Sequence, residues 1–438
     1  MPVTFLPEAY AEEFLADHPG AGLMRLISRG DPARGGVLCD GMSEELFTQR
    51  LLELMTSRKR YRDHQVELRG VTTRNLAPVL RDVPIAELWP SVHRGEQSNS
   101  TVFFGEHLVI KLYRRSGEGI NPDWELSRYL TERCGFAHTP KALGAIEVLE
   151  NSGATRTLAV AHELVPNEGD AWQYFLHQLG GYFERLPSVG RRPLRGKSGD
   201  HPLGLDRSEP PDLAEELMGP ILGNAELLGL RTAQLHQALA ADTTDPDMRP
   251  EPFNPHYQRS LYQSIRNQIR QAVELLRARL DSMHVSDRAM ALEVISRESE
   301  LVATLDDIRQ LRVNGLRMRI HGDYHLGQVL FTGKDFMVID FEGEPVKAIS
   351  ARRIKRSPLR DVAGMLRSFD YAAFSAKREY IERFNLRRTA AELADVGAAF
   401  WLAWVGNRFL DTYLKQVAGN LLVEDDHSTD VLLRAFIV

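Results

Sequence analysis

The sequence contains little cysteine and little lysine. Cys39 and Cys134 are its two cysteines, too few for a disulfide framework and without the spacing of a metal site. They are expected to be small buried apolar side chains of a protein that resides in the reducing cytoplasm. Lysines make up only nine of the 54 basic residues, so a lysine inside an apolar strand is conspicuous. Lys111, in LVIKLY, is such a lysine.

Long apolar runs and an excess of positive charge are also absent. The longest apolar runs, such as AAFWLAWVG (398–406), fall well short of the ~20 residues that span a bilayer. The N-terminal text MPVTFLPEAYAEEF lacks the basic start and apolar stretch of a signal peptide. A formal charge of −6 disfavours a protein that coats nucleic acid or an anionic membrane. We therefore expect a soluble protein whose partners are small molecules or proteins.

The order of strand-like and helix-like text predicts an α+β protein in three regions. Residues 1–90 are expected to form a small cap subdomain, 91–165 a β-rich lobe, and 166–438 a mostly helical lobe. Within the last region, the Pro-, Gly- and charge-rich stretch 186–212 is typical of an exposed, mobile loop.

Individual elements are expected from periodicity and capping residues. The strands are expected at 36–40, 65–71, 101–104, 108–113 and 157–165. The helices are expected at 43–62, 121–134, 213–241, 256–281, 285–312, 361–386 and 388–417. The helix at 121–134 is expected to begin at Asn121 as N-cap, with Pro122 in its first turn.

A β-rich island at 317–345 carries the most informative polar residues. Asp323 lies in the text HGD, Gln328 follows five residues later, and Asp340 ends the strand FMVID. An enzyme that phosphorylates a hydroxyl needs a carboxylate to accept the proton and oxygen ligands to hold Mg²⁺ against ATP. The order of these residues matches that of kinases, with Asp323 as catalytic base and Gln328 and Asp340 as metal ligands. Taken singly, HGD could equally be an ordinary Asx turn, Gln328 a solvated polar residue and Asp340 a strand-end cap.

Two upstream residues fit the same chemistry. Strand alternation places Lys111 on one face of its sheet with Val109, where a lysine is costly unless it meets phosphate or a carboxylate. Glu125, on the following helix, is its expected partner, and Asp123 is the alternative. Before the strand lies a short polar turn that could donate hydrogen bonds to the phosphates. Its residues are Gln97, Ser98, Asn99 and Ser100.

Several segments together closely resemble the maltokinases, especially the form associated with trehalose synthase. The segments are GEQSNSTVFFGEHLVIKLYRR, GINPDWELSRYLTE, VPNEGDAWQYF, RIHGDYHLGQVL, IDFEGEP and SPLRDVAGMLRSFDYAA. The resemblance runs from about residue 95 to the end of the sequence. It implies a bilobal, protein kinase-like fold and ATP- and Mg²⁺-dependent phosphorylation of maltose to maltose 1-phosphate for α-glucan synthesis, with trehalose synthase as a partner.

The resemblance also implies roles for further residues. Main-chain groups of Glu163 and Val165, in HELVP, are expected to meet adenine, and Glu342, in FEGEP, to help the metal site or the sugar. Asp361, in LRDVAG, is expected to hold the backbone of the HGD loop from below.

Two other functions remain open on the sequence alone. One is a related kinase for another sugar or amino sugar, such as glucosamine; the other is a non-catalytic, kinase-shaped partner of trehalose synthase. In the maltokinases, text like LLRAF opens a further helix that helps line the sugar site, whereas this sequence ends at LLRAFIV (432–438). The aromatic residues Trp401, Trp404 and Tyr413 could stack on a sugar, but core packing is the expected role.

Overall fold

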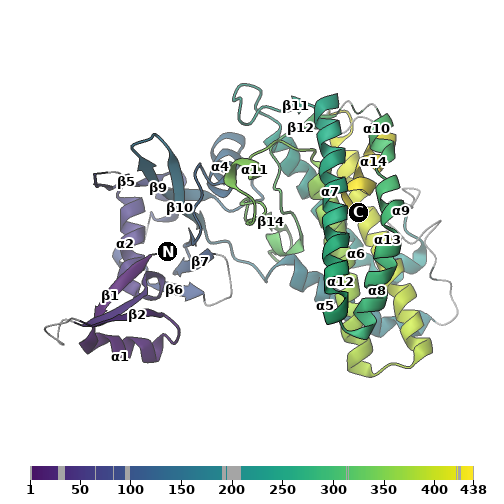
Figure 1. Ribbon diagram of the computed structural model, residues 1–438, viewed down its shortest axis with the longest axis horizontal. Helices are drawn as coiled ribbons and strands as arrows, with labels where there is room; N and C mark the ends of the chain where they lie inside the picture. Colours follow the sequence, from purple (N-terminus) through teal and green to yellow (C-terminus); the bar gives the residue numbers. More distant parts are fainter. Residues whose placement is uncertain are drawn as a thin grey trace. The chain divides into compact units, whose positions relative to one another are not determined.

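The computed structural model divides the chain into two compact units (Figure 1). Unit 1 comprises Met1–Pro166 and Ile339–Arg353, and unit 2 comprises Asn167–Val338 and Ile354–Val438. The structure describes residues 2–27, 35–64, 66–81, 83–93, 99–189, 194, 209–311, 313, 315–420, 422 and 426–437. Unit 1 holds the larger sheet and unit 2 the long helices, which confirms the predicted α+β class.

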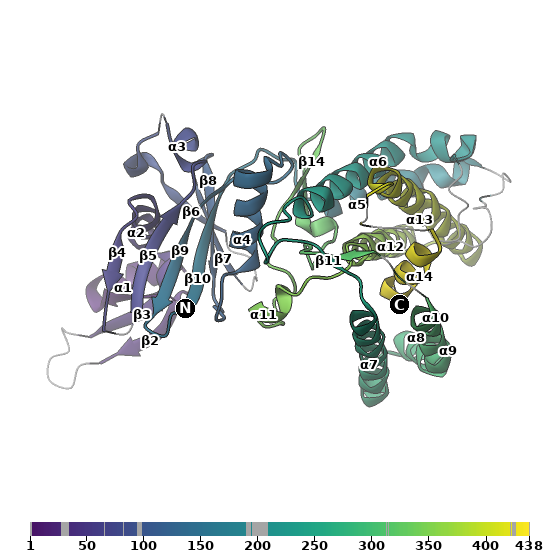
Figure 2. The ribbon, with the colours of Figure 1, turned by 90° about the horizontal axis from the view of Figure 1, so that it is seen from above.

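A seven-stranded antiparallel sheet organises unit 1 (Figure 2). Its strand order is β4-β5-β9-β10-β8-β7-β6. The strands are β4 (Arg60–Arg62), β5 (Val66–Thr72), β6 (Pro90–His93), β7 (Asn99–Phe104), β8 (Leu108–Tyr113), β9 (Ala142–Glu150) and β10 (Thr155–Glu163). Strand β5 pairs with β9 along its whole length, so two strands from the predicted cap region belong to the same sheet as the β-rich region.

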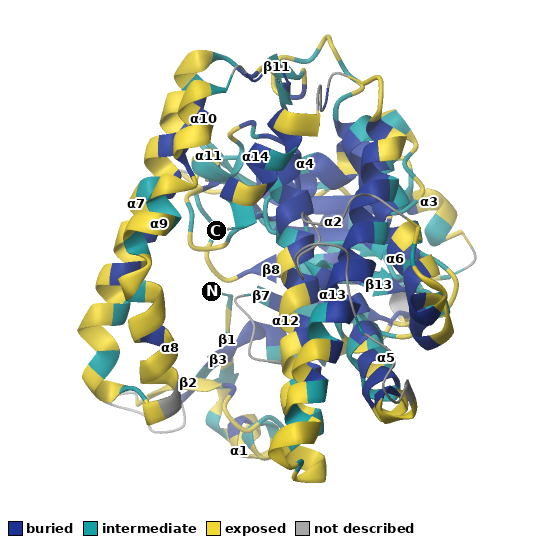
Figure 3. Ribbon diagram, turned by 90° about the vertical axis from the view of Figure 1, so that its right-hand side faces the viewer, coloured by how far each residue is buried: buried dark blue, intermediate teal, exposed yellow. Residues whose placement is uncertain are grey.

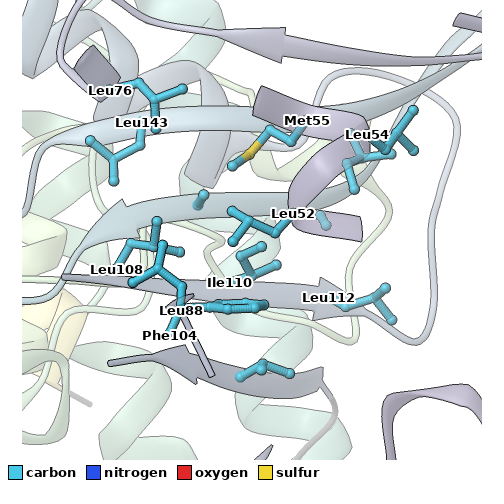
Figure 4. Packing of buried hydrophobic residues seen from close by; sticks show 14 of the residues in the cluster. Leu52, Leu54, Met55, Leu76, Leu88, Phe104, Leu108, Ile110, Leu112 and Leu143 are labelled. Atoms are coloured by element: carbon cyan, nitrogen blue, oxygen red, sulfur yellow. The ribbon is translucent and has the colours of Figure 1, made fainter. Parts of the chain in front are cut away.

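The two faces of this sheet have different environments because strand side chains alternate. Leu108 and Ile110 of β8 pack against Leu52 of helix α2 (Glu45–Thr56) in one apolar cluster (Figure 4). On the opposite face, Tyr113 packs with Trp124 of helix α4 (Pro122–Arg128). Lys111 shares the α4 face, as predicted, because it alternates with the α2-facing residues of β8.

Capping residues set where the helices of unit 1 begin. The main-chain N–H groups of Leu46 and Phe47 donate to the Glu44 side chain, so α2 begins after Glu44 and not at Ser43. The Asp123 N–H donates to the Asn121 side chain at 2.9 Å, which confirms the predicted cap of α4. A π-helical stretch, Tyr129–Cys134, continues α4 and completes the helix predicted at 121–134.

A second, three-stranded sheet and short helices complete unit 1. Strand β3 (Gly36–Asp40), which was predicted, lies between β1 (Val3–Pro7) and β2 (Gly22–Leu26). The remaining helices are α1 (Glu8–Asp17), α3 (Leu76–Val79) and α11 (Ile349–Arg352).

Unit 2 is mostly helical, as predicted for 166–438. Its helices are α5 (Ala171–Arg185), α6 (Asp212–Leu239), α7 (Pro255–Arg279), α8 (Val285–Ser296), α9 (Glu298–Ala303), α10 (Asp306–Gln310), α12 (Leu359–Phe384), α13 (Arg388–Val417) and α14 (Asp426–Ile437). Its strand pairs are β11 (Glu251–Pro252) with β12 (Leu316–Arg317), and β13 (Val329–Phe331) with β14 (Phe336–Val338). The single helix predicted over 285–312 is three helices, because the helical backbone is interrupted near Arg297 and Thr304. Most of the predicted loop 186–212 (190–193 and 195–208) lies outside the described residues.

The core of unit 2 is aromatic. Trp401 is fully buried on α13 and makes edge-to-face contacts with Phe175 and Phe369, and Trp404 and Tyr413 of the same helix are also buried. The structure thus confirms their expected packing role. Helices α7, α8 and α9, by contrast, present long exposed faces (Figure 3).

No helix in the described part of the chain is both long and apolar enough to cross a membrane. The cytoplasmic location stays a prediction.

Candidate active site

The structure brings Lys111 together with Asp340, a residue 229 positions later in the sequence. The Lys111 ammonium donates a hydrogen bond to Asp340 Oδ1, and its Nζ lies 3.1 Å from Glu342 Oε2. Asp340 follows β14 and has a φ of 63°, in the left-handed region that residues other than glycine rarely adopt. Such backbone conformations cluster at functional sites, where surrounding contacts maintain them.

The carboxylates around Lys111 keep its ammonium charged. Burial lowers the pKa of Lys111, but the neighbouring Asp340, Asp123 and Glu342 carboxylates raise it, and the net pKa lies above its ordinary value. The lysine side chain is 18% exposed and that of Asp340 28% exposed. A charged, partly accessible ammonium beside a partly accessible carboxylate is suited to binding phosphate and a divalent cation.

Glu125 is not the partner of Lys111, contrary to the prediction. Its carboxylate accepts hydrogen bonds from the Arg353 guanidinium at 2.6 and 3.1 Å. Asp123 instead lies on the sheet side of α4, where it accepts a hydrogen bond from the Tyr113 hydroxyl at 2.8 Å and from the Phe341 N–H at 3.1 Å. Positions two residues apart on a helix point about 200° apart, so only one of the two carboxylates can face the sheet.

Glu342 is enclosed by donors. Besides its ion pair with Lys111, it accepts hydrogen bonds from Asn99 Nδ2 at 2.9 Å and from Arg352 Nη1 at 2.9 Å, and its side chain is 7% exposed. Asn99 was predicted to contact phosphate and Glu342 to contact metal or sugar. The structure shows both of them in contact with each other.

The predicted phosphate turn is only partly described. Gln97 and Ser98 lie outside the described residues, and β7 begins at Asn99. The Ser100 hydroxyl accepts a hydrogen bond from Arg114 Nε at 2.8 Å. Ser100 is buried on the same face of β7 as Val102, whereas Thr101 pairs with Lys111 on the adjacent strand. Alternation therefore points the Ser100 side chain away from the Lys111 face.

The two residues predicted to meet adenine lie at the end of β10 and just after it. The Glu163 N–H donates to the Lys141 carbonyl at 2.9 Å, and the Glu163 carboxylate pairs with the Lys141 ammonium at 3.1 Å. Val165 lies just after this strand, in a segment without regular secondary structure. The roles of Glu163 and Val165 toward adenine stay predictions.

In unit 2, Asp361 holds the HGD loop. Its buried carboxylate accepts hydrogen bonds from the main-chain N–H of His321 at 2.8 Å and of Gly322 at 3.0 Å. These bonds confirm the predicted support role of Asp361. His236 Nε2 lies 3.2 Å from the same carboxylate. Burial raises the pKa of Asp361, but the His236 hydrogen bond and charge, together with His321 and the Gly322 N–H, bring the net pKa below its ordinary value.

Two glycines allow the loop to lie close to helix α12. Gly322 has a φ of 86°, which a residue with a side chain rarely adopts. A Cβ on Gly364 of α12 would lie 2.6 Å from the Tyr324 carbonyl oxygen, so glycine is required there for close approach of the loop backbone. The Leu326 N–H also donates to the Ser368 hydroxyl of α12 at 3.1 Å.

Asp323 and Gln328 are presented by this supported loop. Both side chains are partly exposed, and neither makes a side-chain hydrogen bond or ion pair within the described ranges. The Gln328 N–H donates to the His325 carbonyl at 2.9 Å, which closes the short turn Leu326–Gln328 before β13. Their oxygens thus remain available for a ligand.

The donors for a metal fit magnesium better than a transition metal. Asp340 in unit 1 offers a carboxylate oxygen and Gln328 in unit 2 an amide oxygen, and each is a hard donor of the kind that Mg²⁺ prefers. In the described portion of the chain, no three His, Cys, Asp or Glu side chains are grouped so that they could hold a metal ion. A bound Mg²⁺ would therefore take its remaining ligands from outside such a cluster, as it commonly does from nucleotide phosphates and water.

The sequence is similar to those of two glucosamine kinases. A glucosamine kinase from Streptacidiphilus jiangxiensis is 26% identical over 342 residues, which cover 77% of this chain and 64% of that protein. A glucosamine kinase from Mycolicibacterium smegmatis is 26% identical over 321 residues, covering 71% and 64%. The chain thus spans less than two thirds of the length of these relatives. No family model matches the sequence.

A solved structure shows the same fold. Glucosamine kinase in complex with glucosamine, ADP and inorganic phosphate matches with a TM-score of 0.60 at 19% identity, over 93% of this chain and 79% of that one. A second crystal form of glucosamine kinase gives the same TM-score at 20% identity. The predicted kinase-like fold is therefore confirmed.

Proposed function

We propose that this protein is an ATP- and Mg²⁺-dependent sugar kinase, with glucosamine as its substrate. The contact of Lys111 with Asp340 carries the proposal, because it joins the lysine expected at the phosphates to the aspartate expected at the metal. The fold shared with a solved glucosamine kinase and the two curated relatives support the choice of an amino sugar.

The proposed reaction assigns one step to each group. The Asp323 carboxylate accepts the proton of a sugar hydroxyl, whose oxygen forms a bond to the γ-phosphorus of ATP while the bond to the β,γ-bridging oxygen breaks and ADP leaves. Lys111 would offset charge on the phosphates, and Asp340 and Gln328 would each offer an oxygen ligand to Mg²⁺, which would neutralise further phosphate charge. The support of the HGD loop by Asp361 favours this assignment, because a general base must be held in place.

Maltose is the second candidate substrate. The segments RIHGDYHLGQVL, IDFEGEP and SPLRDVAGMLRSFDYAA, which resemble maltokinase, support it. The comparisons favour glucosamine, since the two relatives described above are glucosamine kinases. Association with trehalose synthase stays a prediction of the resemblance.

A coupled assay of ADP release, with ATP, Mg²⁺ and either sugar, tests the proposal. We expect turnover with glucosamine, and the Asp323→Asn variant should lower kcat by about 10²–10⁴-fold with an unchanged melting temperature. Asp395→Asn, which alters an exposed pair with Lys377, is the control and should keep full activity.

Each other outcome has a definite meaning. Turnover of maltose alone would replace the substrate, and full activity of Asp323→Asn would remove Asp323 from the chemistry. ATP binding without turnover of any sugar would favour the non-catalytic partner. A chain that binds no ATP would refute the kinase proposal.

A further inference from the structure

Glu342 has contacts that differ from those of the neighbouring carboxylate at Asp340. One of its oxygens contacts Lys111 and Asn99, and the other contacts Arg352. The Glu342 side chain is 7% exposed, whereas that of Asp340 is 28% exposed. Glu342 is thus enclosed and supplied with donors, while Asp340 remains accessible.

The hydrogen bonds of Glu342 leave little capacity for a metal ion. A carboxylate has about four lone-pair sites, and the two oxygens of Glu342 already accept hydrogen bonds from Asn99 and Arg352 and form an ion pair with Lys111. Two of these three partners, Lys111 and Arg352, are cations, and Arg352 is itself 9% exposed. Removing a buried carboxylate from paired cations is costly, so this arrangement is expected to persist when ligands bind.

We propose that Glu342 is the positioning residue that holds Lys111 in place for the nucleotide phosphates. It takes the role that was predicted for Glu125, whose carboxylate pairs with Arg353. The inference rests on the proposed function, in which Asp340 serves the metal. Lys111 then needs a second carboxylate that stays paired with it while Asp340 binds the metal, and Glu342 meets this requirement.

The supports of Glu342 come from two other elements. Asn99 is the first residue of strand β7, and Arg352 is the last residue of helix α11. Arg352 also donates to the main-chain carbonyls of Pro345 and Lys347, which fixes the segment that follows Asp340. Through Glu342, Lys111 is thereby connected to the start of β7 and to the segment that follows Asp340.

The test measures binding of ADP in EDTA, without metal, to the full chain and its Glu342→Gln variant. Loss of the charged partner of Lys111 is expected to weaken this binding about tenfold, or about 1.4 kcal/mol, because the ammonium is then no longer held in place by this ion pair. The KM for ATP should rise similarly, while the Mg²⁺ concentration for half-maximal rate stays unchanged. Glu147→Gln is the matched control and should change none of these values, since Glu147 is also a buried carboxylate, 6% exposed and paired with Arg69.

A metal-ligand role for Glu342 gives the opposite pattern. ADP binding in EDTA that equals or exceeds that of the wild-type chain, with a raised Mg²⁺ requirement, would overturn the proposal. Should Glu342→Gln not fold, Arg352→Lys tests the same connection, because Arg352 does not contact Lys111 in the described structure. We expect that variant to weaken ADP binding about threefold, and an unchanged affinity would overturn the proposal.

Failure of the proposed function gives a separate result. If the wild-type chain binds no adenine nucleotide, the kinase proposal fails and the role of Glu342 fails with it. If the wild-type chain binds ADP and both variants bind it equally well, only the role of Glu342 is refuted.

Discussion

Replacing Asp361 with asparagine should destabilise unit 2 by about 3–5 kcal/mol. The Asp361 carboxylate is fully buried and serves three donors, the N–H groups of His321 and Gly322 and the ring of His236. An asparagine keeps one acceptor oxygen and puts an NH₂ group where the second oxygen was. At least one buried N–H then loses its acceptor, and His236 loses a charged partner, each at a cost of about 1–3 kcal/mol.

The pH dependence of stability gives a second readout. The pKa of Asp361 is lowered in the folded protein, so its stabilisation is complete above the unfolded pKa of about 3.9 and is lost as the pH falls through the folded value. Below about pH 4 the wild-type chain should therefore lose stability more steeply than Asp361→Asn.

Urea denaturation at pH 7 and at lower pH measures both effects. The control is Asp395→Asn, because Asp395 forms an exposed pair with Lys377 and should cost at most about 1 kcal/mol. An Asp361→Asn variant within about 1 kcal/mol of wild type, or with the wild-type dependence on acid, would show that the carboxylate does not carry the loop.

Two further predictions concern packing. Gly364→Ala should lower the free energy of unfolding by about 1–3 kcal/mol, because the new Cβ would meet the Tyr324 carbonyl oxygen. Gly223→Ala, in open space on α6, should raise it by about 0.5–1 kcal/mol. Thermal denaturation of the two variants tests this, and equal shifts in melting temperature would contradict it. Leu52→Ala should lower the free energy of unfolding, measured in urea, by about 2–5 kcal/mol, since Leu52 is fully buried. Leu46→Ala, on the exposed side of the same helix, should lower it by at most about 0.5 kcal/mol. Comparable losses would contradict the assignment of Leu52 to the core.

Sequence patterns predicted those elements whose position depends on neighbouring residues. Strand β8, the helix cap at Asn121 and the long helix α13 all lie where periodicity and capping predicted them. Strand β9 was missed because its first six residues are all buried, and its opening text ALGAI shows no alternation of apolar and polar residues. Helix α5, another missed element, has a capping residue, Asp170, that could have revealed its start.

Sequence patterns indicated less clearly which residues lie around Lys111. Alternation on β8 indicated that Tyr113 shares its face, and Asp123 was the alternative partner on α4. Arg352 and Arg353 gave no such signal, because an arginine before a helix end is common in any sequence.

The sequence by itself determined the α+β class, the candidate residues for the proposed phosphoryl transfer and the face on which Lys111 lies. These follow from composition, spacing and the period of two along a strand, which are properties of neighbouring residues. Only the tertiary structure decided which carboxylate meets Lys111. Asp340 and Glu342 reach it from more than 200 residues away, and the helical rotation between Asp123 and Glu125 directs Glu125 to Arg353. Such pairs depend on how strands and helices pack, which spacing along the chain does not specify.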